Sequence, residues 1–218
     1  MEAALDTGRV LELFYTAEAA THERNAALIA RTQASEITER AAKALGDTVT
    51  PPGIVAVCRQ LTSPLPETPT LLAVLVDVAD PGNAGTIVRV ADAMGADAVV
   101  FAGDSVDPHN GKCVRASAGS IFHLPIVVQD SGFEALQTLA TAADGEVDLD
   151  DADELLARPT AWLFGNEAHG LPADVLAKAD HRIRIPIHGR AESLNLATAA
   201  AICLYASARV RKQLGPLE

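Results

Sequence analysis

The chain has 218 residues, of which 49% are hydrophobic and 4% aromatic, and its formal net charge is −12. This length allows one or two domains, and the acidic balance argues against a protein that coats nucleic acid without specificity. The chain has no run of about 18 apolar residues and does not open with a basic segment followed by an apolar one, so the sequence predicts neither a transmembrane helix nor a signal peptide.

Residues 1–60 are predicted to form a small first domain. Their patterns indicate a half-helix at 2–5, a strand at 10–15, helices at 22–31 and 35–45, and a strand at 54–58. About 60 residues is marginal for an independent hydrophobic core, so we expect either that this unit lacks an upstream strand and helix or that it leans on the next domain. Residues 61–69 contain three prolines and no periodicity, and are predicted to be a linker.

From residue 70 onward, strand patterns alternate with helix patterns, which predicts a parallel α/β domain over 70–218. The predicted strands are 71–77, 98–101, 126–128, 161–164 and 183–187. The predicted helices are 86–94, 112–121, 133–142, a short one from 172, and a last one over 196–211. Ligands of parallel sheets bind beyond the carboxyl ends of the strands. The polar loops expected to build a site there are 78–85, 165–170 and 188–195.

The sequence gives little support to a disulfide framework or a metal site. The cysteines are far apart and form no CxxC pair, so we expect reduced core thiols in a cytosolic protein: Cys58, Cys113 and Cys203. The acidic segment 144–154 has no fixed ligand spacing and is predicted to be a solvated loop and helix start. The histidines near the predicted loops lack further ligands and are expected at the surface or in hydrogen bonds: His169, His181 and His188.

Residues 80–95 place one arginine near the ends of the predicted strands. The segment is neither a Walker loop nor GxGxxG, so a nucleotide-phosphate site is poorly supported. Helical spacing assigns the core side to Ile87, Val90, Ala91 and Met94. Thr86 and Arg89 then fall on the other side. Arg89 is therefore either a surface residue or a grip for an anion such as an RNA phosphate, because a guanidinium matches a phosphate in a fork.

Two later stretches place polar side chains in predicted loops. Glu167 follows a strand in a loop that two glycines can tighten, which favours a functional carboxylate. Ser193 lies outside any GxSxG elbow, so a hydrolase nucleophile is not indicated. Ser193 or Asn195 can cap the next helix, and 192–211 is then either a core or dimer helix or the edge of a ligand site. The residues alone predict one polar site without naming a reaction: Asn83, Arg89, Glu167, Ser193 and Asn195.

Taken together, these stretches resemble the SpoU (TrmH-type) RNA 2′-O-ribose methyltransferases of the SPOUT superfamily. The family's Asn–x–Gly with an arginine six residues after the Asn matches 83–89. Its Gly–x–Glu–x–x–Gly matches 165–170, and its Ile–Pro followed by Ser–Leu–Asn matches 185–186 and 193–195. The segment 115–119 also looks familial. The likeness covers about residues 70–214, with the motifs in the family's order.

The resemblance implies an α/β fold in which a parallel-sheet SPOUT domain carries a deep trefoil knot in its C-terminal half. It implies S-adenosyl-L-methionine bound in that knot, a homodimer through the C-terminal helix, and neither metal nor membrane. The cofactor contacts that it places in this chain are Gly165, Ile185, Leu194, Leu163, Asn166, Pro186 and Ile187. The catalytic positions are the five polar residues already named.

Within this resemblance, Arg89 is expected to clamp a phosphate and to orient the ribose hydroxyl. A role as base is disfavoured, because the pKa of an arginine exceeds about 12. Glu167 and Asn195 are expected to order the loops and to orient the hydroxyl. Much of the rate would then come from alignment of the reacting groups.

Residues 1–60 resemble, more weakly, the L30e-like RNA-binding domain of ribosomal-RNA members of the family, mainly through Asp47–Cys58. This unit is shorter than the family's usual one. The resemblance favours 23S rRNA as substrate and a cytoplasmic location. The alternatives are a tRNA 2′-O-methyltransferase, a non-catalytic RNA- or ribosome-binding protein that keeps the fold, and a small-molecule α/β enzyme.

Overall fold

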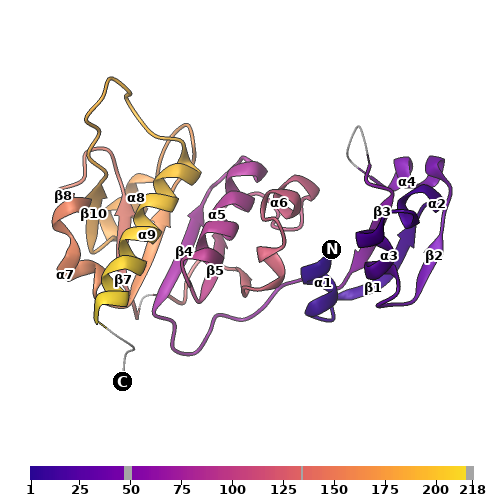
Figure 1. The fold of residues 1–218 in the computed structure, drawn as a ribbon. Helices are drawn as coiled ribbons and strands as arrows, with labels where there is room; N and C mark the ends of the chain where they lie inside the picture. Colours follow the sequence, from indigo (N-terminus) through magenta and orange to yellow (C-terminus); the bar gives the residue numbers. More distant parts are fainter. Residues whose placement is uncertain (47–50, 134, 215–218) are drawn as a thin grey trace. The chain divides into compact units, whose positions relative to one another are not determined.

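The computed structural model describes residues 1–46, 51–133 and 135–214. The chain folds into two compact units, Met1–Leu61 and Thr62–Glu218 (Figure 1). Each unit has its own sheet.

The first unit holds a three-stranded sheet in the order β2-β1-β3. Its strands are β1 (Val10–Tyr15), β2 (Ala34–Glu36) and β3 (Ile54–Cys58). Its helices are α1 (Glu2–Asp6), α2 (Ala17–Ala20), α3 (Glu23–Ile29) and α4 (Glu39–Leu45). β1 pairs in parallel with β2 and in antiparallel with β3. The strands predicted at 10–15 and 54–58 are confirmed.

The helix predicted over 35–45 is wrong at its start. Residues 34–36 pair with β1 instead, and α4 begins only after Thr38, whose hydroxyl oxygen accepts a hydrogen bond from the Ala41 N–H at 3.2 Å. The helix predicted over 22–31 is the shorter α3, with α2 ahead of it. Residues 47–50 belong to the stretch that carries the L30e likeness and lie outside the described residues, so that likeness stays a prediction.

The second unit contains a seven-stranded sheet in the order β6-β5-β4-β9-β7-β10-β8. The strands are β4 (Leu71–Val76), β5 (Ala98–Ala102), β6 (Ile126–Val128), β7 (Gln137–Thr141), β8 (Val147–Asp148), β9 (Thr160–Phe164) and β10 (His181–Arg184). The α-helices are α5 (Pro81–Ala93), α6 (Gly111–Ala116), α7 (Asp153–Leu156), α8 (Ala173–Lys178) and α9 (Leu196–Leu214). Two 3₁₀ turns are η1 (Ser120–Phe122) and η2 (Leu149–Asp151). Every strand pair in the described part of this sheet is parallel, which confirms the parallel α/β prediction.

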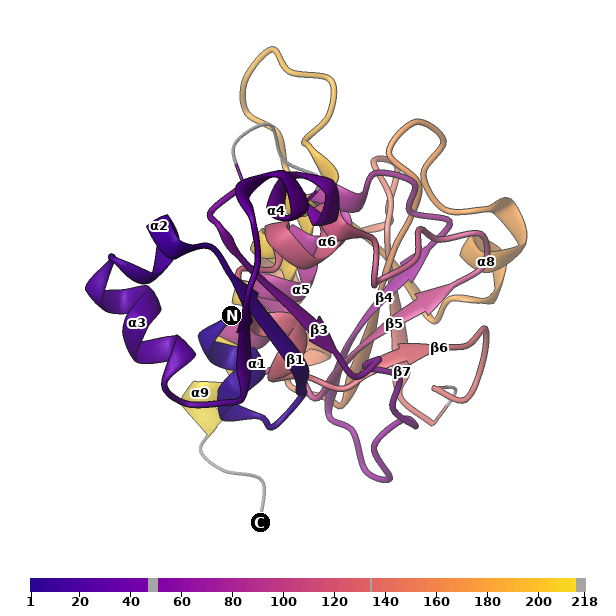
Figure 2. The same ribbon diagram turned by 90° about the vertical axis from the view of Figure 1, so that its right-hand side faces the viewer.

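Helices cover both faces of this sheet, so its central strands are apolar apart from Thr160 at the start of β9. All residues of β4, β5 and β9 are buried. Helices α5 and α9 lie on one face and α8 on the other (Figure 2). On the α8 face, Val175 packs against a core cluster that includes Val74 and Leu163. On the α9 face, the Trp162 indole N–H donates a hydrogen bond to the Ser207 hydroxyl at 2.9 Å, which ties β9 to α9.

The helix predicted over 133–142 is wrong. Residues 137–141 form β7, which pairs with both β9 and β10, while residue 134 lies outside the described part of the chain. The adjacent Leu139 and Ala140 are both buried, because the sheet is covered on both faces. β7 reads Gln-Thr-Leu-Ala-Thr, which is neither an apolar run nor an alternation of apolar and polar side chains, so its pattern does not separate a strand from a helix.

Two further boundaries differ from the predictions. The helix expected over 112–121 stops at Ala116, because Ala118 (φ 52°) and Gly119 (φ 104°) adopt left-handed backbone conformations. The strand expected over 183–187 covers His181–Arg184 instead. Residues 185–187 therefore leave the sheet, at the point where they enter the site described below.

The acidic segment 144–154 forms the edge of the sheet and contains β8, η2 and α7, where a loop and a helix start were expected. Two ion pairs join this edge to β10. Arg182 Nε lies 2.8 Å from Glu146 Oε2, and Arg184 Nε lies 2.7 Å from Asp148 Oδ1. Charged side chains along an edge strand also oppose pairing with another sheet.

These ion pairs make the stability of the second unit depend on pH. The backbone N–H and guanidinium of Arg182 lower the pKa of Glu146, and the Arg184 guanidinium lowers the pKa of Asp148. A pKa that is lower in the folded than in the unfolded chain contributes stability above the ordinary carboxylate value of about 4. That contribution is lost as pH falls through the folded values. We expect the urea midpoint to fall between pH 5 and pH 3.

The Glu146→Gln/Asp148→Asn double variant should show a shallower acid decline in urea midpoint than the parent. Asp150→Asn is the control, because Asp150 is exposed and has no side-chain partner among the residues that the structure describes. Equal pH slopes for parent and double variant would contradict the assignment.

Candidate functional site

The first element of the site is the start of α5, directly after β4. The loop expected over 78–85 is wrong in its second half, since the helix begins at Pro81. Asp80 is the N-cap, and its Oδ1 accepts a hydrogen bond from the Asn83 N–H at 2.8 Å. Proline suits the first helical position because its missing N–H is not needed there. Asn83 thus lies in the first turn of a rigid helix, and Arg89 lies about two turns further along, exposed.

The second element is the loop 165–170, which follows β9. Asn166 and Gly170 exchange backbone hydrogen bonds at 2.9 and 2.8 Å, which closes the loop. The Asn166 amide nitrogen also donates to the carbonyl of Asp77 at 2.8 Å, at the end of the neighbouring strand. A Cβ on Gly165 would lie 2.3 Å from backbone atoms of Gly170 and Leu171. Only glycine fits at that close approach.

Glu167 joins the first two elements. Its carboxylate accepts hydrogen bonds from the backbone N–H of Ala79 at 3.2 Å, the backbone N–H of Asp80 at 3.1 Å, and the side-chain amide of Asn83 at 3.0 Å. Partial desolvation acts to raise the pKa of Glu167, but these hydrogen bonds outweigh it and lower the pKa below its ordinary value. Glu167 is therefore a carboxylate at neutral pH.

The third element is the start of α9. Asn195 Oδ1 accepts from the Thr198 N–H at 3.2 Å, so the predicted cap of this helix is confirmed for Asn195. Asn195 Nδ2 donates to Asn83 Oδ1 at 3.0 Å. Because a carboxylate only accepts, the Asn83 NH₂ must face Glu167 and its oxygen must face Asn195. A chain of hydrogen bonds, Glu167–Asn83–Asn195, therefore joins three segments far apart in sequence.

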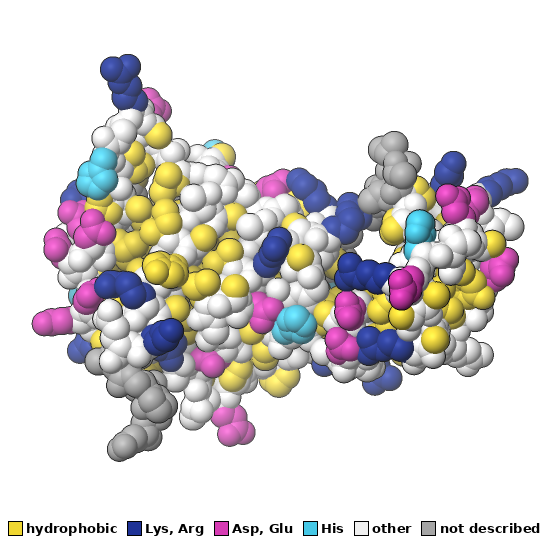
Figure 3. Space-filling model, in the orientation of Figure 1, with side chains coloured by type: hydrophobic (Ala, Val, Ile, Leu, Met, Phe, Trp, Pro, Cys, Tyr) yellow, Lys and Arg dark blue, Asp and Glu magenta, His cyan; other side chains and the backbone are white. Residues whose placement is uncertain are grey.

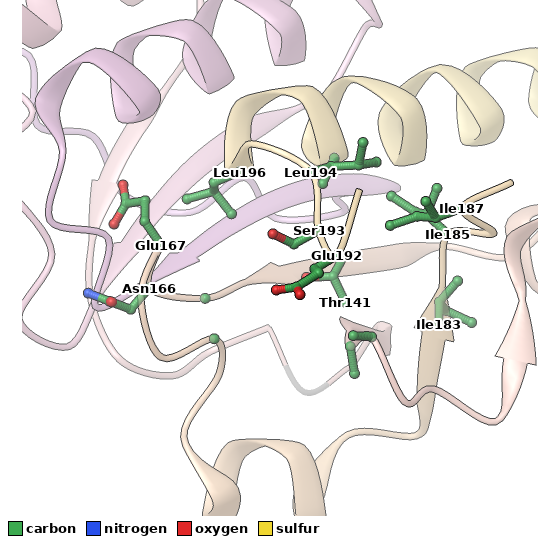
Figure 4. A pocket seen from close by; sticks show the side chains of 15 residues that line it. Thr141, Asn166, Glu167, Ile183, Ile185, Ile187, Glu192, Ser193, Leu194 and Leu196 are labelled. Atoms are coloured by element: carbon green, nitrogen blue, oxygen red, sulfur yellow. The ribbon is translucent and has the colours of Figure 1, made fainter. Parts of the chain in front are cut away.

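An apolar pocket adjoins this polar chain, between the ends of β7, β9 and β10 and the start of α9. Ile183, Ile185 and Ile187 gather at one end, while Asn166 and Glu167 lie at the other (Figure 4). Such a surface suits a ligand with a flat apolar part and a polar part. The cavity encloses about 170 Å³, which is less than the several hundred Å³ that bury a drug-sized ligand.

The structure brings most of the predicted site residues together. Ser193 and five of the predicted cofactor contacts line the pocket: Gly165, Asn166, Ile185, Ile187 and Leu194. Leu163 does not line it, because it packs into the core on the opposite face of the sheet. Pro186 is not among the lining residues, and neither is Arg89. Arg89 has no hydrogen bond or ion pair within the described residues, so its guanidinium is available to an external group.

Several lining residues were not predicted from the sequence. They are Thr141, Ala142, Ala143, Ile183, Leu196 and Ala199, whereas Gly170 and Glu192 line the pocket from within the predicted loops 165–170 and 188–195. Residues 141–143 were missed because the strand before them was expected to be a helix. The signal present in the sequence was the dipeptide Asp144-Gly145, which marks a turn at the end of a strand.

The described part of the chain contains no group of three or more His, Cys, Asp or Glu side chains that could hold a metal ion. None of the described helices is long and apolar enough to cross a membrane. The three cysteines are free thiols.

Comparison with known proteins places these features in a family. Residues 70–205 match the profile of the SpoU rRNA Methylase family. The chain is 38% identical over 177 residues to 23S rRNA (guanosine(2553)-2′-O)-methyltransferase RlmP of Bacillus subtilis, covering 78% of this chain and 70% of that one. It is 36% identical over 178 residues to a 23S rRNA (uridine(2479)-2′-O)-methyltransferase of Streptomyces viridochromogenes, covering 74% of this chain and 61% of that one.

Solved structures give the same picture. The SpoU methyltransferase AviRb from Streptomyces viridochromogenes, in complex with AdoMet, superposes with a TM-score of 0.85 at 30% identity, covering 99% of this chain and 88% of that one. An AdoMet-bound rRNA methyltransferase from Sinorhizobium meliloti superposes with a TM-score of 0.80 at 32% identity, covering 96% and 85%.

Proposed function

Because the chain belongs to the SpoU rRNA methylase family, we propose that it transfers a methyl group from S-adenosyl-L-methionine to a ribose 2′-hydroxyl of RNA, with 23S rRNA as the substrate. The observation that carries the proposal is the hydrogen-bonded chain Glu167–Asn83–Asn195 beside an apolar pocket. A decayed binding module would have no need to keep these three polar side chains in register.

The pocket fits the chemistry of S-adenosyl-L-methionine. Its isoleucines and Leu194 offer an apolar surface to an adenine ring, and the backbone of 165–170 offers polar groups at close range, because Gly165 carries no side chain. The cavity is smaller than a ligand of this size requires, so we expect the exposed segment 188–195 to shift when the cofactor binds.

When bound, S-adenosyl-L-methionine supplies an electrophilic methyl group for the ribose oxygen. The chain's own residues must hold that oxygen in line. Arg89 can clamp an RNA phosphate in a fork and hold the ribose in place. Its pKa above about 12 makes it a poor base.

Glu167 is also unsuited to the role of base. Its pKa is lowered and its carboxylate already accepts three hydrogen bonds. We assign it to ordering the loops after β4 and β9. Asn83 and Asn195 then present their amides in fixed orientations at the start of α5 and α9, where the hydroxyl can be oriented.

Transfer of labelled methyl from S-adenosyl-L-methionine tests the proposal. Unmodified 23S rRNA and unmodified tRNA transcripts are offered separately. We expect label in 23S rRNA, resistant to alkali at one position as 2′-O-methylation requires. Label in tRNA alone would support the tRNA alternative, and label in neither RNA would overturn methyl transfer to RNA.

Further features of the family belong to this proposal. The sheet order inserts β9 between β4 and β7 and inserts β10 between β7 and β8, which supports a knotted path. We propose that the first unit contributes RNA binding as an L30e-like domain, although it is a small one. An rRNA substrate would place the enzyme in the cytoplasm.

We also propose that the enzyme is a homodimer through α9. Hydrophobic side chains gather over this part of the face shown in Figure 3, and Tyr205 in the middle of α9 is 60% exposed. Its neighbours one turn away on the helix include the small residues Ala201 and Ala208, which allow close packing with a second copy. A large exposed aromatic on such a surface is typical of an interface.

Tyr205→Glu is therefore expected to convert the dimer into a monomer, because a charge would be buried without a partner. Multi-angle light scattering on the eluting protein measures the mass. Val128→Glu is the control, since Val128 is exposed to a similar extent, 59%, on edge strand β6. A Tyr205→Glu protein that remains dimeric would contradict the assignment of α9.

A further inference from the structure

Helices α5 and α6 pack against each other with almost no side chain between them. A Cβ on Gly85 would lie 2.2 Å from the carbonyl oxygen of Cys113 and 2.7 Å from the Ala116 side chain. Three residues earlier, a Cβ on Gly82 would lie 3.2 Å from Cε of Lys112. Gly85 therefore lies against the backbone of α6 and holds the two helices at backbone-contact distance, while Gly82 lies beside the Lys112 side chain.

This packing sets Arg89 in line with the cations of α6. Arg89 follows Gly82 and Gly85 by seven and four residues, so it lies on the same stripe of α5. Lys112 and Arg115 are one turn apart on α6, and all three cations are exposed. Lysine and arginine side chains are accordingly seen over the α5–α6 part of the surface in Figure 3.

The two sequence segments that carry these cations contain no acidic residue, although Asp80, Asp92 and Asp107 flank them. Residues 62–218 carry ten more acidic than basic side chains, yet neither 81–91 nor 108–129 contains an Asp or Glu. The nearest carboxylate to Lys112 is the N-cap Asp80, at 2.6 Å. It occupies one of the three donors of the ammonium and leaves two for another acceptor.

Three exposed cations on two closely packed helices, in segments of an acidic protein that themselves contain no acid, match the charge of a nucleic-acid backbone. We propose that the α5–α6 surface binds the phosphates of the RNA strand that flanks the target nucleotide, through Lys112 and Arg115. This inference rests on the proposed function, because Arg89 on the same stripe is assigned to the phosphate of the target itself. The surface would hold the flanking strand in register with the site.

The test measures binding of a 23S rRNA transcript by filter retention over a series of salt concentrations. For each RNA phosphate that the protein no longer neutralises, the negative slope of log K against log salt concentration becomes shallower by about 0.7. Lys112→Gln and Arg115→Gln should each show this change, with affinity weakened about fivefold at 0.1 M salt. The double variant should show both changes together. Lys112→Arg should restore the parent slope, because the charge is kept.

Lys178→Gln is the matched control. Lys178 is an exposed lysine paired with an aspartate, as Lys112 is, but it lies on α8 on the opposite face of the sheet. Calorimetric binding of S-adenosyl-L-methionine to every variant shows whether the site has stayed folded. If both α6 variants bind the transcript with the affinity and the salt dependence of the parent, the α5–α6 surface does not bind RNA phosphates.

The same experiments distinguish failure of the proposed methyl transfer from failure of the proposed phosphate-binding surface on α5 and α6. If the parent transfers no methyl group to RNA while the α6 variants still change the slope, the surface stands and the activity does not. If the parent methylates 23S rRNA while the α6 variants bind it like the parent, the activity stands and the surface does not.

Discussion

Arg89→Ala is expected to abolish detectable methyl transfer, with a loss in kcat of about 10³-fold or more, while S-adenosyl-L-methionine binds as tightly as to the parent. The residue is exposed, has no partner within the described residues and does not line the pocket. Its removal therefore takes away no interaction that holds the fold or the cofactor. What it removes is the group that aligns the ribose, and misalignment of reacting atoms is costly in rate.

Two variants complete the measurement of methyl transfer at saturating cofactor. Arg89→Lys keeps the charge but loses the fork, so we expect intermediate activity. Arg158→Ala removes an exposed arginine near the start of β9, away from the polar chain, and should behave as the parent. Full activity in the Arg89→Ala protein would reject the role assigned to Arg89.

The strands at the centre of the sheet were predictable from the sequence because burial on both faces leaves a strong local signal. The runs at 71–77, 98–101 and 161–164 contain almost only apolar residues and are followed by polar or small residues. β7 lacks this signal, because its sequence Gln-Thr-Leu-Ala-Thr is neither an apolar run nor an alternating pattern, and it was therefore predicted as part of a helix. β7 is defined by its pairing with β9 and β10, which is tertiary information.

The start of α5 shows a different kind of error. Residues 80–85, Asp-Pro-Gly-Asn-Ala-Gly, have the composition of a loop. Asp at the N-cap followed by Pro at the first helical position is also a helix-start signal. Gly85 is present because the backbone of α6 packs directly against it. The loop-like composition of this segment therefore reflects a close contact between two helices and not a loop.

The candidate site was predictable as a set of residues but not as a network. Asn83, Glu167 and Asn195 were singled out by their loops and by the family resemblance. Their hydrogen bonds span 84 and 112 residues of sequence, and only the fold brings those loops to one edge of the sheet. Ile183 and residues 141–143 likewise line the pocket only because the strand order places β7 beside β9 and β10 beside β7.

Gly165→Ala is expected to abolish S-adenosyl-L-methionine binding, with affinity reduced about 100-fold or more. The added Cβ would meet the backbone of Gly170 and Leu171 at 2.3 Å, and backbone atoms cannot turn aside as a flexible side chain can. The loop must therefore open, which breaks the exchange of hydrogen bonds between Asn166 and Gly170 and shifts Glu167. Overpacking of this kind costs about 1–3 kcal/mol of stability, so the variant should still fold.

Calorimetry measures the binding of the cofactor, and the fluorescence of Trp162, the single tryptophan of the chain, follows unfolding. Gly189→Ala is the matched control. It lies in the exposed segment at the other side of the pocket, and a Cβ there would have no atom within 4 Å. It should bind the cofactor as the parent does. A folded Gly165→Ala protein with parent affinity would show that the loop 165–170 tolerates opening, and the cofactor would then have to be held by the isoleucine end of the pocket alone.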